Sequence, residues 1–265
     1  MTKALFTLTS AESKRLIARA VSRLPEVLAA RQSGRIIISG GTTNAFVAEE
    51  MLGREVDKAR YTAGIVARGR QCATPAGERI APFVMINGQG SSEPWEKVLD
   101  GFSAGDVFIK GANAVDAEGH AGILLGHPQG GTIGRALGVV AARGAHLVIP
   151  VGLEKFVPSV LEAARAAGSQ TFTYSIGMRV GLMPLVNGIV ITEIEALQLF
   201  GVSATCLGAG GVGGSEGAVV LAVEGDEPQV RDVMEMIRGI KGEPPIPALK
   251  QACRDCAAPC DWKES

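Results

Sequence analysis

The chain has 265 residues, of which 46% are hydrophobic, and its 26 basic and 27 acidic side chains leave a formal net charge of −1. The charges are spread along the chain, which argues against a nucleic-acid partner, because binding to a phosphate backbone depends on clustered Lys and Arg. No segment approaches the roughly 20 apolar residues of a membrane span, and residues 1 to 13 lack the apolar region of a signal peptide. We therefore expect a cytoplasmic protein with no membrane partner.

The cysteine and glycine contents narrow the class of protein further. Five cysteines, three of them in the last thirteen residues, do not form the framework of a disulfide-stapled secreted domain. The 35 glycines exceed the average content of about 7%. Many of them follow apolar runs, where glycine lets the backbone approach a ligand closely.

The first expected elements are a helix, a buried strand and a second helix. Thr9 and Glu12 form a capping-box pattern, and apolar residues then recur at helical spacing over residues 16 to 28. Residues 35 to 39 contain three consecutive Ile, which is typical of a strand buried on both faces. Two glycines end this strand, and a helix through Leu52 is expected to follow.

The middle of the chain alternates short apolar runs with amphipathic stretches. Strands are expected at residues 64–67, 83–86, 106–109 and 146–151, and helices at residues 93–102, 132–143 and 156–167. This alternation predicts an α/β fold with a Rossmann-like, mostly parallel sheet covered by helices on both faces. Ligands of such sheets bind beyond the carboxyl ends of the strands.

The pattern changes from Gly188 onward. The order of expected elements is strand 189–192, helix 193–200, strand 202–207, strand 218–223 and helix 228–240. With an antiparallel pair in its middle, this βαββα order predicts a small ferredoxin-like subdomain. The expected organisation is thus a metabolite-binding core over residues 1–187, the subdomain over residues 188–243, and a Pro- and Cys-rich tail over residues 244–265.

A glycine-rich loop joins the first buried strand to the helix after it. Its residues are Gly40, Gly41, Thr42, Thr43 and Asn44. Free backbone N–H groups, hydroxyl donors and a helix N-terminus together favour an anionic ligand. The alternative is a tight turn in which Thr43 or Asn44 caps the helix and no ligand binds.

Residues 39 to 56, with Gly-Gly-Thr-Thr and the following helix, resemble the phosphate loop of ribose-5-phosphate isomerases. Residues 106 to 116 are similar to the isomerase segment that carries its catalytic acids, and Gly130-Gly131 and residues 146 to 155 follow in the same order. The superfamily with this fold includes glucosamine-6-phosphate deaminases, CoA transferases, sugar-phosphate-responsive repressors and formyltetrahydrofolate cyclo-ligases. The resemblance covers residues 35 to 155, and it implies a homodimer or a higher homo-oligomer.

The chain departs from the isomerase pattern at its catalytic positions. Lys110 and Asn113 stand where the resemblance places two aspartates, Asp116 is retained, and residues 130 to 135 lack the expected general-base glutamate. Isomerising an aldose requires a base that moves a proton between adjacent carbons. We therefore do not expect ribose-5-phosphate isomerase activity.

The same segment still offers candidate catalytic residues at the carboxyl end of an expected strand. Lys110 is predicted to hold a phosphate or carboxylate, and Asp116 or His120 to move a proton. Asn113 is a candidate ligand-binding residue beside them. The alternative is a polar turn without function.

A second glycine turn precedes the helix expected at residues 132 to 143. Gly130, Gly131 and Thr132 form a second candidate anion site there, after His127. His146 opens an apolar strand and is interpreted as structural.

Residues 208 to 213 match the letters of a dinucleotide fingerprint. The fingerprint requires a following helix, whereas a strand is expected here, so the segment is interpreted as a hairpin or lid loop. Glu216 in the same loop resembles the attacking glutamate of CoA transferases, which makes it a candidate nucleophile.

Three cysteines in the tail are close enough in sequence to share one ion. Cys253, Cys256 and Cys260 could hold Zn or an Fe–S cluster, with a fourth ligand such as Cys206 or a residue of a partner chain. The alternative is a tail with reduced cysteines or an adventitious disulfide.

The sequence therefore favours a metabolic enzyme of isomerase or transferase type that binds a phosphorylated or CoA-linked small molecule. Two alternatives stay open. One is a ligand sensor without catalysis, for which no DNA-binding domain is apparent in the chain. The other is a metal protein that depends on the cysteine tail.

Overall fold

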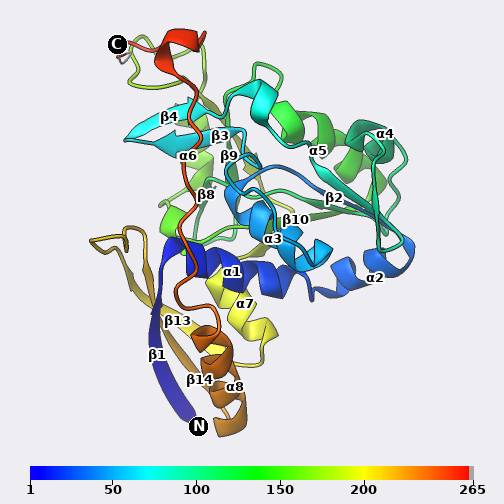
Figure 1. Ribbon diagram of the computed structural model, residues 1–265, viewed down its shortest axis with the longest axis vertical. Helices are drawn as coiled ribbons and strands as arrows, with labels where there is room; N and C mark the ends of the chain where they lie inside the picture. The colour runs from blue at the N-terminus through cyan, green and yellow to red at the C-terminus, as the bar shows by residue number, and fades with distance from the viewer. Residues whose placement is uncertain (263–265) are drawn as a thin grey trace.

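The computed structural model describes residues 1–262 and has a mixed α/β fold built around a six-stranded sheet (Figure 1). This confirms the predicted α/β class. The strand order is β12-β10-β7-β2-β5-β6. In that order the strands span Ile189–Ile191, His146–Pro150, Val107–Ile109, Arg35–Ile38, Phe83–Ile86 and Gln89–Ser91.

Three of the five strand pairings in this sheet are parallel. β12, β10, β7 and β2 run parallel, whereas β5 is antiparallel to β2 and to β6. The strand predicted at residues 83–86 thus forms, but it makes the sheet mixed where a mostly parallel one was expected. Asn87 and Gly88 both have positive φ, which matches the tight hairpin turn that sends the chain back antiparallel from β5 to β6.

The strand expected at residues 64–67 forms, but outside the main sheet. β3 (Gly64–Ala67) pairs only with β4 (Arg70–Ala73), through a turn at Arg68 and Gly69 in which both residues have positive φ. A further antiparallel sheet contains β8 (Ala114–Val115), β9 (Ala121–Leu125) and β11 (Gly181–Leu185).

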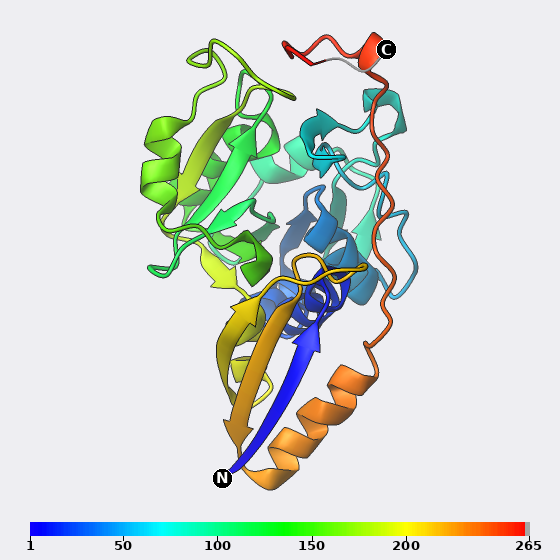
Figure 2. The same cartoon turned by 90° about the vertical axis from the view of Figure 1, so that its left-hand side faces the viewer.

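The three-stranded sheet β1-β14-β13 joins the first strand of the chain to a hairpin late in the sequence (Figure 2). β1 (Thr2–Leu8) is a strand that the sequence analysis missed, because it expected a helix as the first element. It pairs antiparallel with β14 (Val219–Gly225), which pairs antiparallel with β13 (Ser203–Ala209). The strand expected at residues 189–192 as part of this subdomain is instead β12, at the edge of the main sheet.

Helices cover both faces of the main sheet. The structure describes eight α-helices in residues 1–262, and three short 3-10 turns: α1 (Ser10–Val21), α2 (Pro25–Ser33), α3 (Thr42–Leu52), α4 (Trp95–Asp100), α5 (Gly131–Arg143), α6 (Val160–Ala166), α7 (Glu193–Leu199), α8 (Glu227–Arg238), η1 (Ala76–Glu78), η2 (Leu153–Lys155) and η3 (Cys253–Asp255). The first helix is shorter than expected because the chain turns after Val21 and Pro25 begins α2.

The consecutive isoleucines of β2 show why the sheet needs two cores. Ile36 and Ile38 lie in one hydrophobic cluster, with α1, α3 and the small sheet, whereas Ile37 lies in a second cluster with α4 and α5. All three are fully buried, as the predicted two-sided strand requires.

The chain after α8 runs in an extended path along the molecule to the β3–β4 hairpin (Figures 1 and 2). Gln251 N donates to Ala73 O at 2.9 Å, which fixes the tail beside β4. The predicted tail, residues 244–265, is described as far as Trp262, and its last three residues lie outside the described part. Among residues 1–262, none of the helices combines the length and apolar character that a bilayer-spanning segment needs.

Candidate functional site

The glycine-rich loop lies at the carboxyl end of β2, between β7 and the start of α3. Ser39 is fully buried, and its hydroxyl donates to Ile109 O at 3.0 Å. Gly41 N donates to Tyr61 O at 2.7 Å, and the Asn44 amide donates to Ser39 O at 2.7 Å. The loop is therefore held in place from both sides.

No side chain caps the N-terminus of α3, although the sequence analysis named Thr43 or Asn44 as a cap. Gly41 occupies the N-cap position, and both predicted caps lie inside the helix. Thr43 is 2% exposed and Asn44 is fully buried, yet Thr43 Oγ1 and Asn44 Oδ1 have no hydrogen-bond partner within the described chain. The first-turn N–H groups of a helix have no intrahelical partner, so this end of α3 is open to an external acceptor.

Lys110 follows β7 and lies beside the loop. Its Nζ is 3.4 Å from Gly40 O, to which it donates. Burial lowers the pKa of this lysine to about 8, because a charged ammonium is poorly solvated there.

A second half-buried lysine comes from η2, which follows β10. Lys155 Nζ donates to Ala112 O at 3.0 Å. Burial lowers the pKa of Lys155 to about 8, and the positive charges of Lys14 and Lys110 act in the same direction. In the described chain, neither Lys110 nor Lys155 forms an ion pair with a carboxylate.

Two glutamates complete the group beside Lys155. Glu154 forms an ion pair with Lys14 of α1 at 2.6 Å. Burial opposes ionisation of Glu154, but the charges of Lys14 and Lys155 outweigh it and lower its pKa. Glu193 is fully buried at the start of α7, and burial raises its pKa even though Leu153 N donates to its Oε2 at 2.9 Å.

We call Lys14, Lys110, Glu154, Lys155 and Glu193, with the loop of residues 40–44, the carboxyl-edge cluster. Of its five charged residues, the sequence analysis named only Lys110. Lys155 and Glu193 follow β10 and β12, so their place at the carboxyl ends of parallel strands was the available signal. No sequence pattern indicated that Lys14 belongs to the site, because it lies on the expected first helix and not after a strand.

The predicted acid–base pair Asp116 and His120 lies in the turn between β8 and β9. Asp116 Oδ1 accepts from His120 N at 2.8 Å, and Oδ2 accepts from Val160 N at 2.9 Å and contacts His120 Nδ1 at 3.2 Å. Burial opposes ionisation of Asp116, but these hydrogen bonds lower its pKa. The pair orders the turn and the start of α6, and within residues 1–262 no hydrogen bond or ion pair links it to Lys110.

The remaining predicted ligand-binding residues also hold local structure. Asn113 Oδ1 accepts from Leu124 N at 3.1 Å within the β8–β9 hairpin. Gly130 is the N-cap of α5, with Gly131 and Thr132 in its first turn, and it adopts a φ of 77°. Its neighbours include Met183 of β11, and no described contact links it to the loop of residues 40–44.

The glycine-rich segment at residues 208–217 forms the β13–β14 hairpin end, as predicted, and reaches the carboxyl-edge cluster (Figure 2). A Cβ added to Gly217 would lie 3.0 Å from Glu154 Oε2, so glycine permits this approach. Glu216 is exposed, and its Oε2 accepts from Gly214 N at 3.0 Å. The hairpin end therefore covers one side of the cluster.

The tail cysteines line a cavity of about 270 Å³ together with a cysteine that the sequence analysis did not consider. Cys253, Cys256 and Cys260 meet Cys72 of β4 there, whereas Cys206 is exposed on β13 in the small sheet. The candidate fourth ligand within the chain is thus Cys72 and not Cys206.

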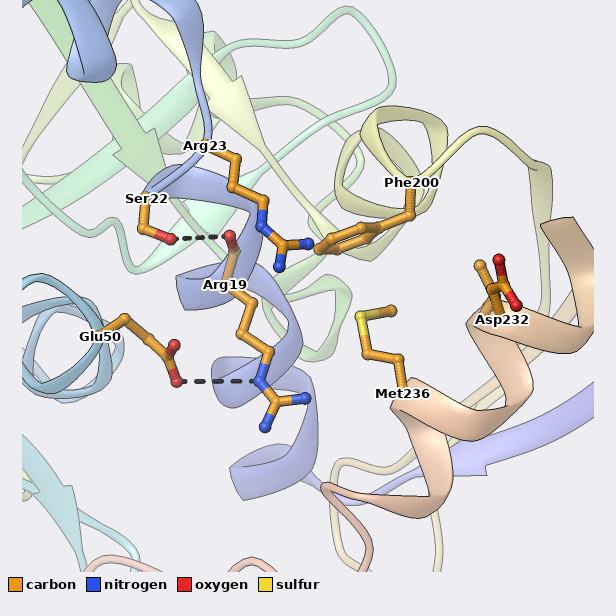
Figure 3. Close-up of a pocket in the computed structure, with 8 residues that line it drawn as sticks. Arg19, Ser22, Arg23, Glu50, Phe200, Asp232 and Met236 are labelled. Atoms are coloured by element: carbon orange, nitrogen blue, oxygen red, sulfur yellow. Dashed lines mark hydrogen bonds and ion pairs between the residues drawn. The ribbon is translucent and has the colours of Figure 1, made fainter. Parts of the chain in front are cut away.

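A second cavity, of about 300 Å³, lies between α1, α7 and α8 (Figure 3). Its two arginines are already engaged, since Arg19 forms an ion pair with Glu50 at 3.8 Å and Arg23 stacks on Phe200 at 5.0 Å. Asp232 adds a second acidic side chain to the lining. Balanced charge makes this cavity a weaker anion site than the carboxyl-edge cluster.

No family model matches the sequence, and no curated protein or solved structure matches the chain. The resemblance to ribose-5-phosphate isomerases and their superfamily therefore stays a prediction.

Proposed function

We propose that the chain binds the anionic end of a phosphorylated or CoA-linked metabolite at the carboxyl-edge cluster. We further propose that side chains of this cluster donate protons to the bound metabolite or accept protons from it. The observation that carries this proposal is the uncapped N-terminus of α3 beside Lys110. A helix N-terminus and an adjacent lysine favour the same ligand, because both present positive charge and N–H donors.

The two half-buried lysines support an anionic ligand independently. Lys110 and Lys155 hydrogen-bond only to carbonyl oxygens in the described chain. Glu154 lies close enough to Lys155 to interact with its charge, whereas no carboxylate offsets the desolvation of Lys110. A desolvated charge is unfavourable, and a bound phosphate or carboxylate would compensate the charge of Lys110. Thr43 Oγ1 adds a buried group with an unused hydrogen-bonding position in the same loop.

Two glutamates with opposite pKa shifts support proton transfer. Glu154 is held ionised by neighbouring lysines, whereas burial favours the protonated form of Glu193. Pairs of titratable groups whose pKa values are driven apart are typical of an acid and a base at one site. Glu193 is the proposed general acid and Glu154 the proposed base, with Lys155 as an electrostatic stabiliser of developing negative charge.

The proposal keeps a Rossmann-like core but not the predicted ferredoxin-like subdomain as such, since β12 belongs to the main sheet and β1 to the small one. It does not invoke ribose-5-phosphate isomerase chemistry, since the oxygens of Asp116 are occupied by backbone N–H groups and His120. Isomerisation requires a group that moves a proton, and a phosphorylated or CoA-linked substrate of either reaction type would bind here through its anionic group. The hairpin end over Glu154 would exclude water from either reaction.

The test is a thermal-shift and calorimetric screen with inorganic phosphate, sugar phosphates, CoA and acetyl-CoA. A ligand at a hundred times its dissociation constant adds about 2.7 kcal/mol to stability. A Lys110→Met chain should lose the effect, whereas Lys97→Met, at an exposed position on α4, should retain it. Thr43→Val should also weaken binding without loss of stability, since Thr43 Oγ1 makes no hydrogen bond in the described chain.

Two outcomes would count against the proposal. Equal binding by the Lys110→Met and Lys97→Met chains would place the anion elsewhere. If the folded protein bound none of the ligands in the panel, the proposed anion site would be wrong. Binding without turnover of any ligand would keep the site and favour the sensor interpretation over the enzyme.

A further inference from the structure

Four of the five cysteines meet at one cavity, although they come from distant parts of the sequence. Cys72 lies on β4, and Cys253, Cys256 and Cys260 lie in the tail that crosses the molecule to reach it (Figure 1). None of the four forms a disulfide, and all are partly buried. The cavity of about 270 Å³ lies between the β3–β4 hairpin, the tail and the segment at Gly177.

We propose that Cys72, Cys253, Cys256 and Cys260 hold a 4Fe–4S cluster. Each thiolate would bind one of the four irons, and four cysteine thiolates are the ligand set that such clusters use. None of these residues belongs to the carboxyl-edge cluster, so this site and the proposed function stand or fail separately.

The spacing of the sulfurs favours a cluster over a single zinc ion. Tetrahedral zinc with Zn–S bonds of about 2.3 Å requires its four sulfurs to lie about 3.8 Å apart. In the described chain, the only His, Cys, Asp or Glu group whose ligand atoms all lie within 4.8 Å of one another is Asp116, Glu118 and His120. No three of the four sulfurs thus lie within 4.8 Å of one another, which is wider than one zinc ion requires and leaves room for a larger centre.

The surroundings of the thiols supply hydrogen-bond donors to sulfur. Gly177 N donates to Cys260 Sγ at 3.1 Å, and Lys250 Nζ donates to Cys253 Sγ at 3.3 Å. Hydrogen bonds to the sulfurs stabilise the negative charge of an Fe–S centre. Lys250 adds a positive charge close to the thiolates, which acts in the same direction.

The backbone is built so that the segment at Gly177 can approach β4. Gly177 has a φ of 100°, and a Cβ at this position would lie 2.8 Å from Gln71 N. Gly177 also forms a parallel bridge with Gln71, the residue before Cys72. This contact fixes one wall of the cavity on the ordered β3–β4 hairpin, while the tail supplies the opposite wall.

The test uses the full chain purified without oxygen and reconstituted with iron and sulfide. About four iron and four sulfide ions per chain, with the broad visible absorption and EPR spectrum of a reduced 4Fe–4S cluster, are expected. Cys206→Ser is the matched control, since this cysteine is exposed and outside the cavity, and it should leave iron content and spectra unchanged. Cys72→Ser and Cys256→Ser should each lose the 4Fe–4S spectrum.

Circular dichroism of the metal-free variants separates loss of ligand from loss of fold. A Cys72→Ser chain that is folded but has lost the cluster spectrum supports the proposal. Three results would overturn it: no iron bound by the folded wild-type chain, a Cys72→Ser chain with the iron content and EPR spectrum of Cys206→Ser, or one tightly bound zinc per chain when iron, sulfide and zinc are offered together.

Discussion

Lys110 shows how one side chain can be unfavourable for folding and useful for binding. Its ammonium is desolvated beside Gly40 O, which lowers its pKa to about 8. The unfolded chain therefore binds more protons than the folded chain between pH 8 and 10.5. The destabilising effect of this charge is complete below the folded-state pKa, and stability rises as the pH passes through that window.

The substitution Lys110→Met should remove this dependence. At pH 7 we expect the variant to be more stable by about 1 to 3 kcal/mol, because each pKa unit corresponds to about 1.4 kcal/mol. The gain should shrink as the pH is raised above about 8. Urea titrations of the two chains across this pH range measure both effects, and a gain that does not depend on pH would show that side-chain packing is its source.

At the scale of the elements, α1 is the helix that joins the separate parts of the molecule. Arg15 forms ion pairs with Glu49 and Glu50 of α3 at 2.6 and 2.9 Å, and with Glu243 after α8 at 2.9 Å. Its guanidinium also lies over the ring of Phe46 at 4.8 Å. These partners raise the pKa of Arg15 despite its burial.

We predict that Arg15→Met destabilises the protein by about 3 kcal/mol, because removing one partner of a buried ionic network leaves the other charges uncompensated. Arg238→Met is the control, since Arg238 pairs with Glu235 at the surface of α8, where an ion pair contributes little. Denaturant unfolding of both variants measures the difference. Similar losses for the two chains would mean that the network around Arg15 contributes no more than a surface pair.

At the scale of the whole molecule, one hydrophobic cluster connects the small sheet to the main sheet. Leu8 of β1, Ile17 of α1, Ile36 of β2 and Leu221 of β14 are all fully buried in it. The first strand and a late strand of the chain also meet in this cluster, since β1 pairs with β14 along its full length. The small sheet thus shares its core with the rest of the fold.

We therefore expect one cooperative unfolding transition rather than two. Leu8→Ala should lower the stability of the whole chain by about 2 to 5 kcal/mol, as is typical for truncating a buried Leu. Calorimetry and fluorescence should report the same midpoint for the wild type and the same shifted midpoint for the variant. A small sheet that melts on its own, with the main sheet unaffected, would contradict a shared core.

The sequence by itself determined those features that depend on local residue patterns. Three consecutive isoleucines specified a strand buried on both faces, and the glycine pair after it located the loop at the start of α3. The α/β class and the β13–β14 hairpin followed from hydrophobic periodicity and from glycine content in the same way. The Asn-Gly pair at residues 87–88 is also typical of a β-hairpin turn, although no hairpin was predicted there.

Only the tertiary structure decided which distant residues meet. β1 is stabilised by β14, more than 200 residues later, and the short segment before α1 has no periodicity strong enough to show that partner. The meeting of Lys14 with Glu154, and of Cys72 with the tail, likewise depends on how the chain crosses itself. Burial, and with it the lowered pKa values of Lys110 and Lys155, arises from the assembled surroundings and not from neighbours in sequence.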